Sequence, residues 1–115
     1  MQQITDLGSD AKQTFRFQIE DRNLATFTFY FLDNQIGWYF DVEYDDFKTT
    51  GLRLVNSPNV LSAYENLIRF GLMCTVSDGA EPYFQNDFVT GRVNLYILNK
   101  QEVEQVREVI YAKME

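Results

Sequence analysis

The sequence predicts a mainly β domain: a compact antiparallel barrel or sandwich of about six strands, with one short internal helix and a C-terminal helix. Two observations support this class. Apolar and polar residues alternate in three successive segments of the first half of the chain, which is the period of a strand with one buried face. Aromatic residues make up 16% of the chain, mostly Phe and Tyr, and such rings pack well on a pleated sheet.

The 115 residues are enough for one domain with its own hydrophobic core. Residues 1–11 show no periodicity, so we expect a flexible N-terminal arm there. Residues 12–99 are predicted to form the β domain, and residues 100–115 the C-terminal helix.

The first three strands form an antiparallel meander with an aromatic inner face. Polar residues 21–23 suit a hairpin loop, and residues 33–37 suit a turn that Gly37 can close, since glycine tolerates positive φ. The side chains predicted to face inward are, strand by strand, Phe15, Phe17 and Ile19; Phe27, Phe29 and Phe31; and Trp38, Phe40, Val42 and Tyr44.

The second half of the chain is less regular. A shorter strand is expected over Gly51–Val55, because Leu52 and Leu54 alternate with polar neighbours. Ser57-Pro58 is typical of a helix start, and apolar residues at helical spacing up to Ile68 predict a short helix or helical loop that Gly71 ends. We then expect a strand over residues 72–76, a loop over 81–88 and a last strand over 93–98.

The C-terminal helix has a capping signal and an apolar stripe. Asn99 can cap the helix, with Glu102 three residues later as in a capping box. Two interpretations of the stripe stay open, because a small sheet has faces that need covering: it packs on its own domain, or it inserts into a groove on a partner. The stripe residues are Val103, Val106, Ile110 and Met114.

Composition argues against several classes of function. The net charge is −7 and the ten basic residues are scattered, so nucleic-acid binding is not expected, and an acidic mimic of DNA is only a distant alternative. The chain has no histidine, which removes the commonest metal ligand and general base. No signal peptide or membrane-spanning segment is expected. Cys74, in an apolar run, is interpreted as a buried thiol.

Two groups of side chains are candidate binding sites. The carboxylates Asp41, Glu43, Asp45 and Asp46 could catch calcium, but a straight strand spreads carboxylates along a line, so a solvated face is the preferred interpretation. Outward-facing aromatic residues could bind sugars, although packing on the sheet is the commoner role of such residues. These candidates are Tyr30, Tyr39, Tyr83, Phe84 and Tyr96. We therefore expect no catalytic residues, no metal and no cofactor.

The order of several segments resembles a family of small phage tail and baseplate proteins. Residues 13–15 and 27–29 resemble the first two strands of that family, and residues 38–42, Trp-Tyr-Phe-Asp-Val, resemble its Trp-x-x-Asp-aliphatic strand. Residues 81–82 and 87–96 are similar to its late signature, in which an acid-Pro pair precedes a turn into the last strand. Thr90-Gly91 stands in the reverse of the expected order, and the helix after Asn99 is not part of the resemblance.

The resemblance implies a non-enzymatic structural subunit of a phage tail or baseplate, made in the host cytoplasm and located in the virion. Its expected partners are other tail or baseplate proteins (hub, tube or sheath-proximal) in a hetero-oligomeric assembly, with no nucleic acid and no membrane. The stripe Val103, Val106, Ile110 and Met114 is the candidate partner-binding surface. The alternative function is a free-standing β-rich module that binds a ligand or carbohydrate.

Four residues are expected to have structural roles. Trp38 can anchor the core, and Gly91 can supply a backbone conformation at the entrance of the last strand. Arg92 is a candidate ion-pair partner for Asp41, and the equal alternative is that both side chains face water.

Overall fold

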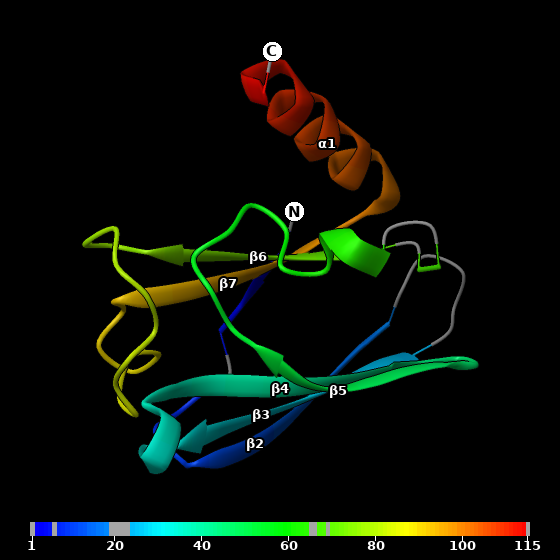
Figure 1. The fold of residues 1–115 in the computed structure, drawn as a ribbon. Helices are drawn as coiled ribbons and strands as arrows, with labels where there is room; N and C mark the ends of the chain where they lie inside the picture. The colour runs from blue at the N-terminus through cyan, green and yellow to red at the C-terminus, as the bar shows by residue number, and fades with distance from the viewer. Residues whose placement is uncertain (1, 6, 19–23, 65–66, 69, 115) are drawn as a thin grey trace.

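The computed structural model describes residues 2–5, 7–18, 24–64, 67–68 and 70–114, and within them seven strands form two antiparallel sheets (Figure 1). The three-stranded sheet has the order β1-β7-β6 and the four-stranded sheet the order β2-β3-β4-β5. The strands are β1 (Gln2–Ile4), β2 (Lys12–Gln18), β3 (Leu24–Leu32), β4 (Gly37–Tyr44), β5 (Phe47–Arg53), β6 (Gly71–Val76) and β7 (Val93–Leu98). The helical elements are the 3-10 turns η1 (Asp33–Gln35) and η2 (Ser62–Tyr64), and the helix α1 (Lys100–Met114).

The predicted aromatic meander is confirmed as β2-β3-β4. The register places Phe15 opposite Phe27 and Phe29 opposite Phe40, so these rings share one face of the sheet. On β3 and β4 the side chains of Phe27, Phe29, Trp38 and Phe40 are fully buried. The predicted inward position of Ile19 lies outside the described residues.

The hydrophobic core lies between the two sheets. Leu72, Cys74 and Val76 of β6 and Val93, Leu95 and Ile97 of β7 are buried against the aromatic face of the other sheet. Phe70, just before β6, meets Phe27 edge-on with ring centroids 5.9 Å apart. The two sheets are not hydrogen-bonded to each other in the described part of the chain, so the fold is a sandwich, and the barrel alternative is wrong.

Three boundaries differ from the predictions. Gln2–Ile4 of the expected arm form β1, which pairs with β7, and Ile4 is buried. The fourth predicted strand begins earlier, at Phe47, because a two-residue turn joins it to β4. The turn before β4 is closed by Ile36 at φ +44° and not by Gly37.

The predicted helix after Ser57 is reduced to the 3-10 turn η2. Ser57 forms a β-bridge with Cys74, in which each backbone N–H donates to the carbonyl of the other residue at 2.9–3.0 Å. The capping role falls to the buried Asn59, whose Oδ1 accepts hydrogen bonds from the N–H groups of Leu61 and Leu72. Tertiary pairing with β6 thus overrides the local helical pattern; residues 65, 66 and 69 lie outside the described chain.

The predicted capping box at the start of α1 is confirmed. Asn99 Oδ1 accepts a hydrogen bond from the N–H of Glu102 at 2.8 Å, and the N–H of Asn99 donates to Glu102 Oε1 at 3.0 Å. Figure 1 shows α1 rising away from the sandwich beyond the end of β7. No helix in the described ranges is long and apolar enough to cross a membrane.

Candidate interaction surfaces

The segment of residues 77–92 connects β6 and β7 of the three-stranded sheet and packs against Trp38 of the four-stranded sheet. Trp38 of β4 is fully buried, and its Nε1–H donates to the carbonyl oxygen of Phe84 at 2.9 Å. The Trp38 ring also packs on Phe88 with centroids 4.7 Å apart. The predicted anchoring role of Trp38 therefore extends beyond the core, since this side chain fixes the position of the 77–92 loop.

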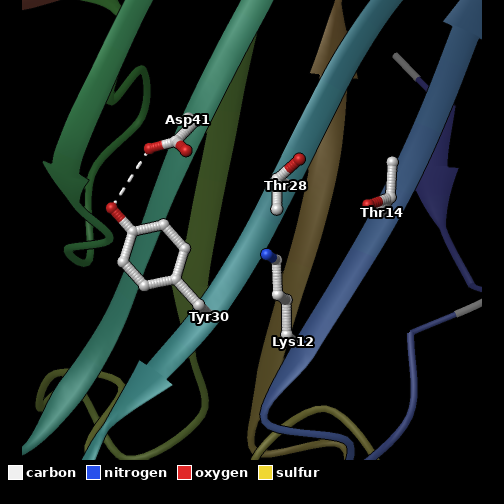
Figure 2. Close-up of a pocket in the computed structure, with 5 residues that line it drawn as sticks. All are labelled: Lys12, Thr14, Thr28, Tyr30 and Asp41. Atoms are coloured by element: carbon white, nitrogen blue, oxygen red, sulfur yellow. Dashed lines mark hydrogen bonds between the residues drawn. The ribbon is translucent and has the colours of Figure 1, made fainter.

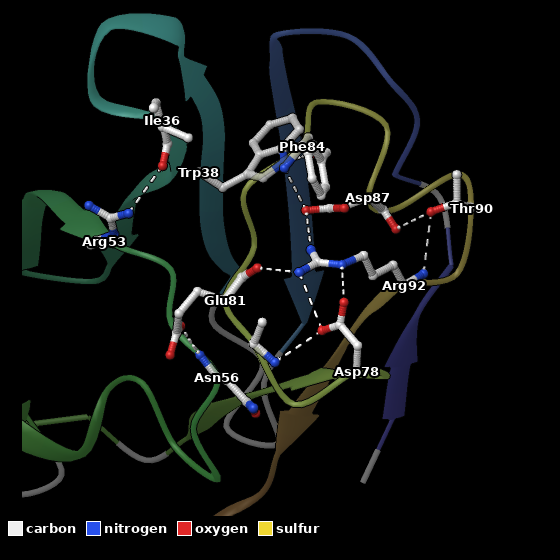
Figure 3. A network of polar contacts seen from close by, with 11 residues as sticks. Ile36, Trp38, Arg53, Asn56, Asp78, Glu81, Phe84, Asp87, Thr90 and Arg92 are labelled. Carbon is white, nitrogen blue, oxygen red and sulfur yellow. Dashed lines mark hydrogen bonds and ion pairs between the residues drawn. The ribbon is translucent and has the colours of Figure 1, made fainter.

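Arg92 organises the interior of this loop (Figure 3). Its Nη1 lies 2.9 Å from Asp87 Oδ2, and its Nε lies 2.9 Å from Asp78 Oδ2. Its Nη2 donates to the carbonyl oxygen of Glu81 at 2.8 Å, and the guanidinium carbon stands 5.1 Å from the ring centre of Phe84. One planar cation with several fixed donors thus ties together four points of the loop.

The two carboxylates around Arg92 have different environments. The Asp87 side chain is 1% exposed and also accepts the Phe84 N–H on Oδ2, whereas that of Asp78 is 55% exposed. Hydrogen bonds from the Ala80 N–H and from Arg92 lower the pKa of Asp78. The hydrogen bond from Arg92 to Asp78, and to a smaller extent the one to Asp87, raise the pKa of Arg92. This network connects Asp78, Glu81 and Asp87 of the loop through one guanidinium group.

The expected relation between Arg92 and Asp41 is replaced by two separate clusters. Asp41 accepts hydrogen bonds on Oδ1 from Tyr30 Oη at 3.1 Å and from the Gly51 N–H at 2.9 Å. Arg92 instead binds residues of its own loop. Gly91 has φ +77°, the left-handed conformation that glycine adopts without strain, at the entrance of β7.

Exposed apolar side chains lie on this loop and on the turn before β4. Tyr83 and Phe84 are 38% and 57% exposed, and Ile36 is 61% exposed. The backbone brings their segments together, because a Cβ placed on Gly37 would lie 3.6 Å from the carbonyl oxygen of Pro82 and Trp38 binds the carbonyl oxygen of Phe84. Figure 3 shows Ile36 on the β4 side of this contact and Phe84 next to Trp38. We call Ile36, Tyr83 and Phe84 the end surface. A β-branched residue at positive φ is strained, and such strain is often found at functional sites.

Arg53 supports the end surface from β5. Its Nη2 donates to the carbonyl oxygen of Ile36 at 3.1 Å, and its Nη1 donates to Tyr39 Oη at 3.1 Å. The guanidinium also lies 5.5 Å from the centre of the Tyr39 ring. The strained turn at Ile36 is therefore held by a side chain from a neighbouring strand.

A shallow hollow of about 560 Å³ lies on the outer face of the four-stranded sheet (Figure 2). It is lined by Lys12, Thr14, Thr28, Tyr30 and Asp41. Burial and the hydrogen bond to Asp41 raise the pKa of Tyr30, whose ring stacks beside Tyr39 with centroids 6.3 Å apart. Lys12 makes no hydrogen bond or ion pair within the described residues, so its ammonium faces solvent there.

The aromatic residues considered for sugar binding do not form one platform. Tyr30 and Tyr39 lie on the outer face of the four-stranded sheet, Tyr83 and Phe84 lie on the end surface, and Tyr96 is half-buried on β7. Asp45 is also displaced from the expected carboxylate row, because it occupies the β4–β5 turn at φ +52°. In the described ranges no three acidic or cysteine side chains converge as a metal site.

The residues of the apolar stripe of α1 differ in burial. Val103 is buried, and a Cβ placed on Gly71 would lie 2.9 Å from its Cγ2, so this residue packs on its own domain. Val106 is half-buried. The side chains of Ile110 and Met114 lie outside the described part of the structure.

The structure defines a small β-sandwich protein with an ion-paired loop, residues 77–92, at one end and a projecting C-terminal helix. A family model described as the cyanophage baseplate Pam3 plug gp18 matches residues 1–100, and the chain belongs to this family. It is thus a structural component of the phage virion, located in the baseplate. A search of curated proteins finds no match.

Proposed function

We propose that this protein is a non-enzymatic baseplate subunit that docks against neighbouring baseplate proteins through the end surface and through α1. The observation that carries the proposal is the exposure of Tyr83, Phe84 and Ile36 on backbone segments whose carbonyls accept hydrogen bonds from Arg92 and Arg53. Aromatic side chains held in one conformation lose little entropy on binding and are enriched among the residues that dominate interfaces.

The charge of the chain defines the kind of partner. Asp33 accepts the Ile36 N–H on its backbone carbonyl, Asp78 and Glu81 belong to the loop that carries Tyr83 and Phe84, and the whole chain carries −7. An acidic rim around an apolar centre favours a partner with an apolar knob surrounded by Lys or Arg, since complementary rims set orientation and association rate. Hub, tube and sheath-proximal proteins of the same baseplate are the proposed neighbours.

The helix is proposed as a second contact. Residues 1–100 match the family model, so most of α1 lies beyond the matched region. Because Val103 is occupied by its own domain, the partner-binding stripe is reduced to Val106, Ile110 and Met114. An isolated helix of this length is marginal in water, so partner contact would stabilise its distal turns.

The test is co-elution with sibling baseplate proteins in size-exclusion chromatography. A Phe84→Ser, Ile36→Ser double variant should keep its thermal transition and stop co-eluting, while the control Leu67→Ser, at a residue 68% exposed outside the end surface, should co-elute normally. Deleting residues 104–115 tests the helix, since Val103 remains to cover Gly71. A monomeric wild-type protein that binds glycans and no baseplate protein would overturn the proposal.

A further inference from the structure

We infer that the free edge of β2 accepts an extended acidic strand from a neighbouring baseplate protein, adding a fifth strand to the sheet β2-β3-β4-β5. The inference deepens the proposed docking function by assigning a third contact and the chemistry of its partner. It begins from the edges of the two sheets, because an edge strand presents unpaired N–H and C=O groups that can pair with another chain.

The other sheet edges carry devices that limit pairing. β6 is covered by the chain itself, since Ser57 pairs with Cys74 and the N–H of Val60 donates to the carbonyl of Leu72. β5 has a bulge, in which Thr50 and Gly51 lie opposite the single residue Asp41, and Gly51 has φ +73°. β1 has only three residues.

The edge of β2 has none of these devices in the described part of the chain. β2 runs for seven residues in unbroken register with β3. Its start is fixed, because the Gln13 amide donates to the carbonyl oxygens of Gly8 and Asp10 and accepts the Gly8 N–H. No backbone hydrogen bond reaches its outer side from another described segment.

The register shows which backbone groups are free. The N–H of Phe31 donates to the carbonyl of Ala11 at 2.7 Å, so odd-numbered residues of β2 are hydrogen-bonded to β3. Because hydrogen-bonded and non-hydrogen-bonded pairs alternate in an antiparallel ladder, the N–H and C=O groups of Lys12, Thr14 and Arg16 point away from β3. These groups form a ready template for an added strand.

The side chains of β2 specify an acidic occupant. Lys12 and Arg16 are both exposed, lie on the outer face about 13 Å apart along the strand, and have no ion-pair partner among the described residues. β2 contains no acidic residue, although the chain carries −7. Pairing two copies of β2 would bring four cations together, whereas a strand with acids four residues apart would place one opposite each cation.

The inner face of the edge also fits an added strand. Phe15 and Phe17 stack with centroids 6.5 Å apart and remain half-buried at the margin of the core. Apolar side chains alternating with the acids of the incoming strand would cover both rings. The occupant is therefore an extended segment with apolar and acidic or polar residues in alternation.

The test uses a synthetic peptide, Thr-Val-Glu-Val-Thr-Val-Glu-Val-Thr, and a matched peptide with Lys in place of both Glu. We expect the acidic peptide to bind and to slow hydrogen exchange at the Thr14 and Arg16 amides, and the Lys peptide to bind about tenfold more weakly. Thr14→Pro removes an outward N–H without removing a β2–β3 bond and should lower affinity about tenfold, while Thr14→Val should not.

A second pair of variants exchanges the charges of the protein and the peptide, so the test does not depend on Thr14→Pro keeping the fold. Arg16→Glu should weaken binding of the acidic peptide, and a peptide with Lys only at the facing position should restore it. Three results would each overturn the inference. The first is slow exchange of the Thr14 and Arg16 amides in the free protein, and the second is equal peptide binding to Thr14→Pro and Thr14→Val. The third is a wild-type dimer that Thr14→Pro abolishes. A last outcome separates the two proposals. If neither the wild type nor Thr14→Pro binds the peptide, and both still co-elute with the baseplate proteins, the edge contact fails while docking through the end surface stands.

Discussion

The Nη1 atom of Arg92 lies 2.9 Å from Oδ2 of Asp87, and the Asp87 side chain is 1% exposed. Asp87 is one of two buried polar residues in the described chain, and its Oδ1 has no hydrogen-bond partner there. The partners of this carboxylate are the Arg92 guanidinium and the Phe84 N–H, both bound to Oδ2. A buried ion pair often adds little net stability compared with well-packed apolar residues of similar volume. The role of this pair is therefore to set the conformation of the loop rather than to stabilise the fold, although loss of one partner is costly.

Arg92→Ala should destabilise the fold by about 3 kcal/mol, because it leaves the Asp87 carboxylate buried without its cation. The free energy of unfolding, measured by urea denaturation, checks this value. Asp78→Ala is the matched control: it removes the other carboxylate partner of Arg92, but that side chain is 55% exposed. If Asp78→Ala lowers the free energy of unfolding as much as Arg92→Ala does, burial of the Asp87 carboxylate is not the cause of the destabilisation.

Gly71→Ala should destabilise the fold by about 1–3 kcal/mol through overpacking. A Cβ at this position would lie 2.8 Å from Asn59 Oδ1 and 2.9 Å from Val103 Cγ2, so both the cap of the 57–61 segment and the base of α1 must shift. Gly8→Ala is the control, since a Cβ there meets nothing within 4 Å. Thermal melting compares the two variants, and equal melting temperatures would show that the region around Gly71 adapts freely.

The sequence predicted those parts of the fold whose cause is local. Alternation alone predicts β3 and β4, because buried residues recur at every second position from Ala25 to Phe29 and from Trp38 to Tyr44. The same pattern gave β7 with its observed bounds, and the Asn99–Glu102 spacing gave the cap of α1.

The elements that local sequence patterns do not predict depend on contacts between distant segments. β1 exists because Gln3 pairs with Tyr96, and Ser57 is extended because it pairs with Cys74. Neither pairing leaves a periodic signal in a segment so short. The Arg92 network is likewise hidden in the sequence. Asp87 falls in a predicted loop and in the segment similar to the family's late signature, and an acid five residues before an arginine does not by itself indicate burial.

Cys74 should be unreactive in the folded protein and should make stability fall at alkaline pH. Burial, with smaller contributions from the charges of Glu81 and Asp87, raises the pKa of Cys74 from 9.0 to about 12. A group whose pKa is raised on folding keeps its full contribution below the unfolded pKa. That contribution is lost between pH 9 and pH 12, at up to about 1.4 kcal/mol per pH unit.

The measurement compares the pH dependence of unfolding for the wild type and Cys74→Ala. Tyrosines and lysines titrate in both proteins, so the difference between the two slopes isolates the thiol. Wild-type stability should decline more steeply above pH 9, and a thiol reagent should label Cys74 only under unfolding conditions. Parallel slopes, or rapid labelling of the native protein, would show that the thiol is accessible.

Asn99→Ala should loosen α1 while leaving the sandwich folded. The substitution removes the acceptor of the Glu102 N–H at the first turn, a loss of about 1 kcal/mol of helix stability. Because Val103 is the buried attachment of α1 to the body, fraying of the first turn should also weaken the packing on Gly71. We expect lower helical ellipticity and faster amide exchange in the first turn, with exchange in β3 and β4 unchanged. Asn86→Ala, at an exposed loop position, is the control and should leave both signals as in the wild type. If Asn99→Ala slows no assembly step although α1 frays, the helix is not a docking element and the end surface must carry that role.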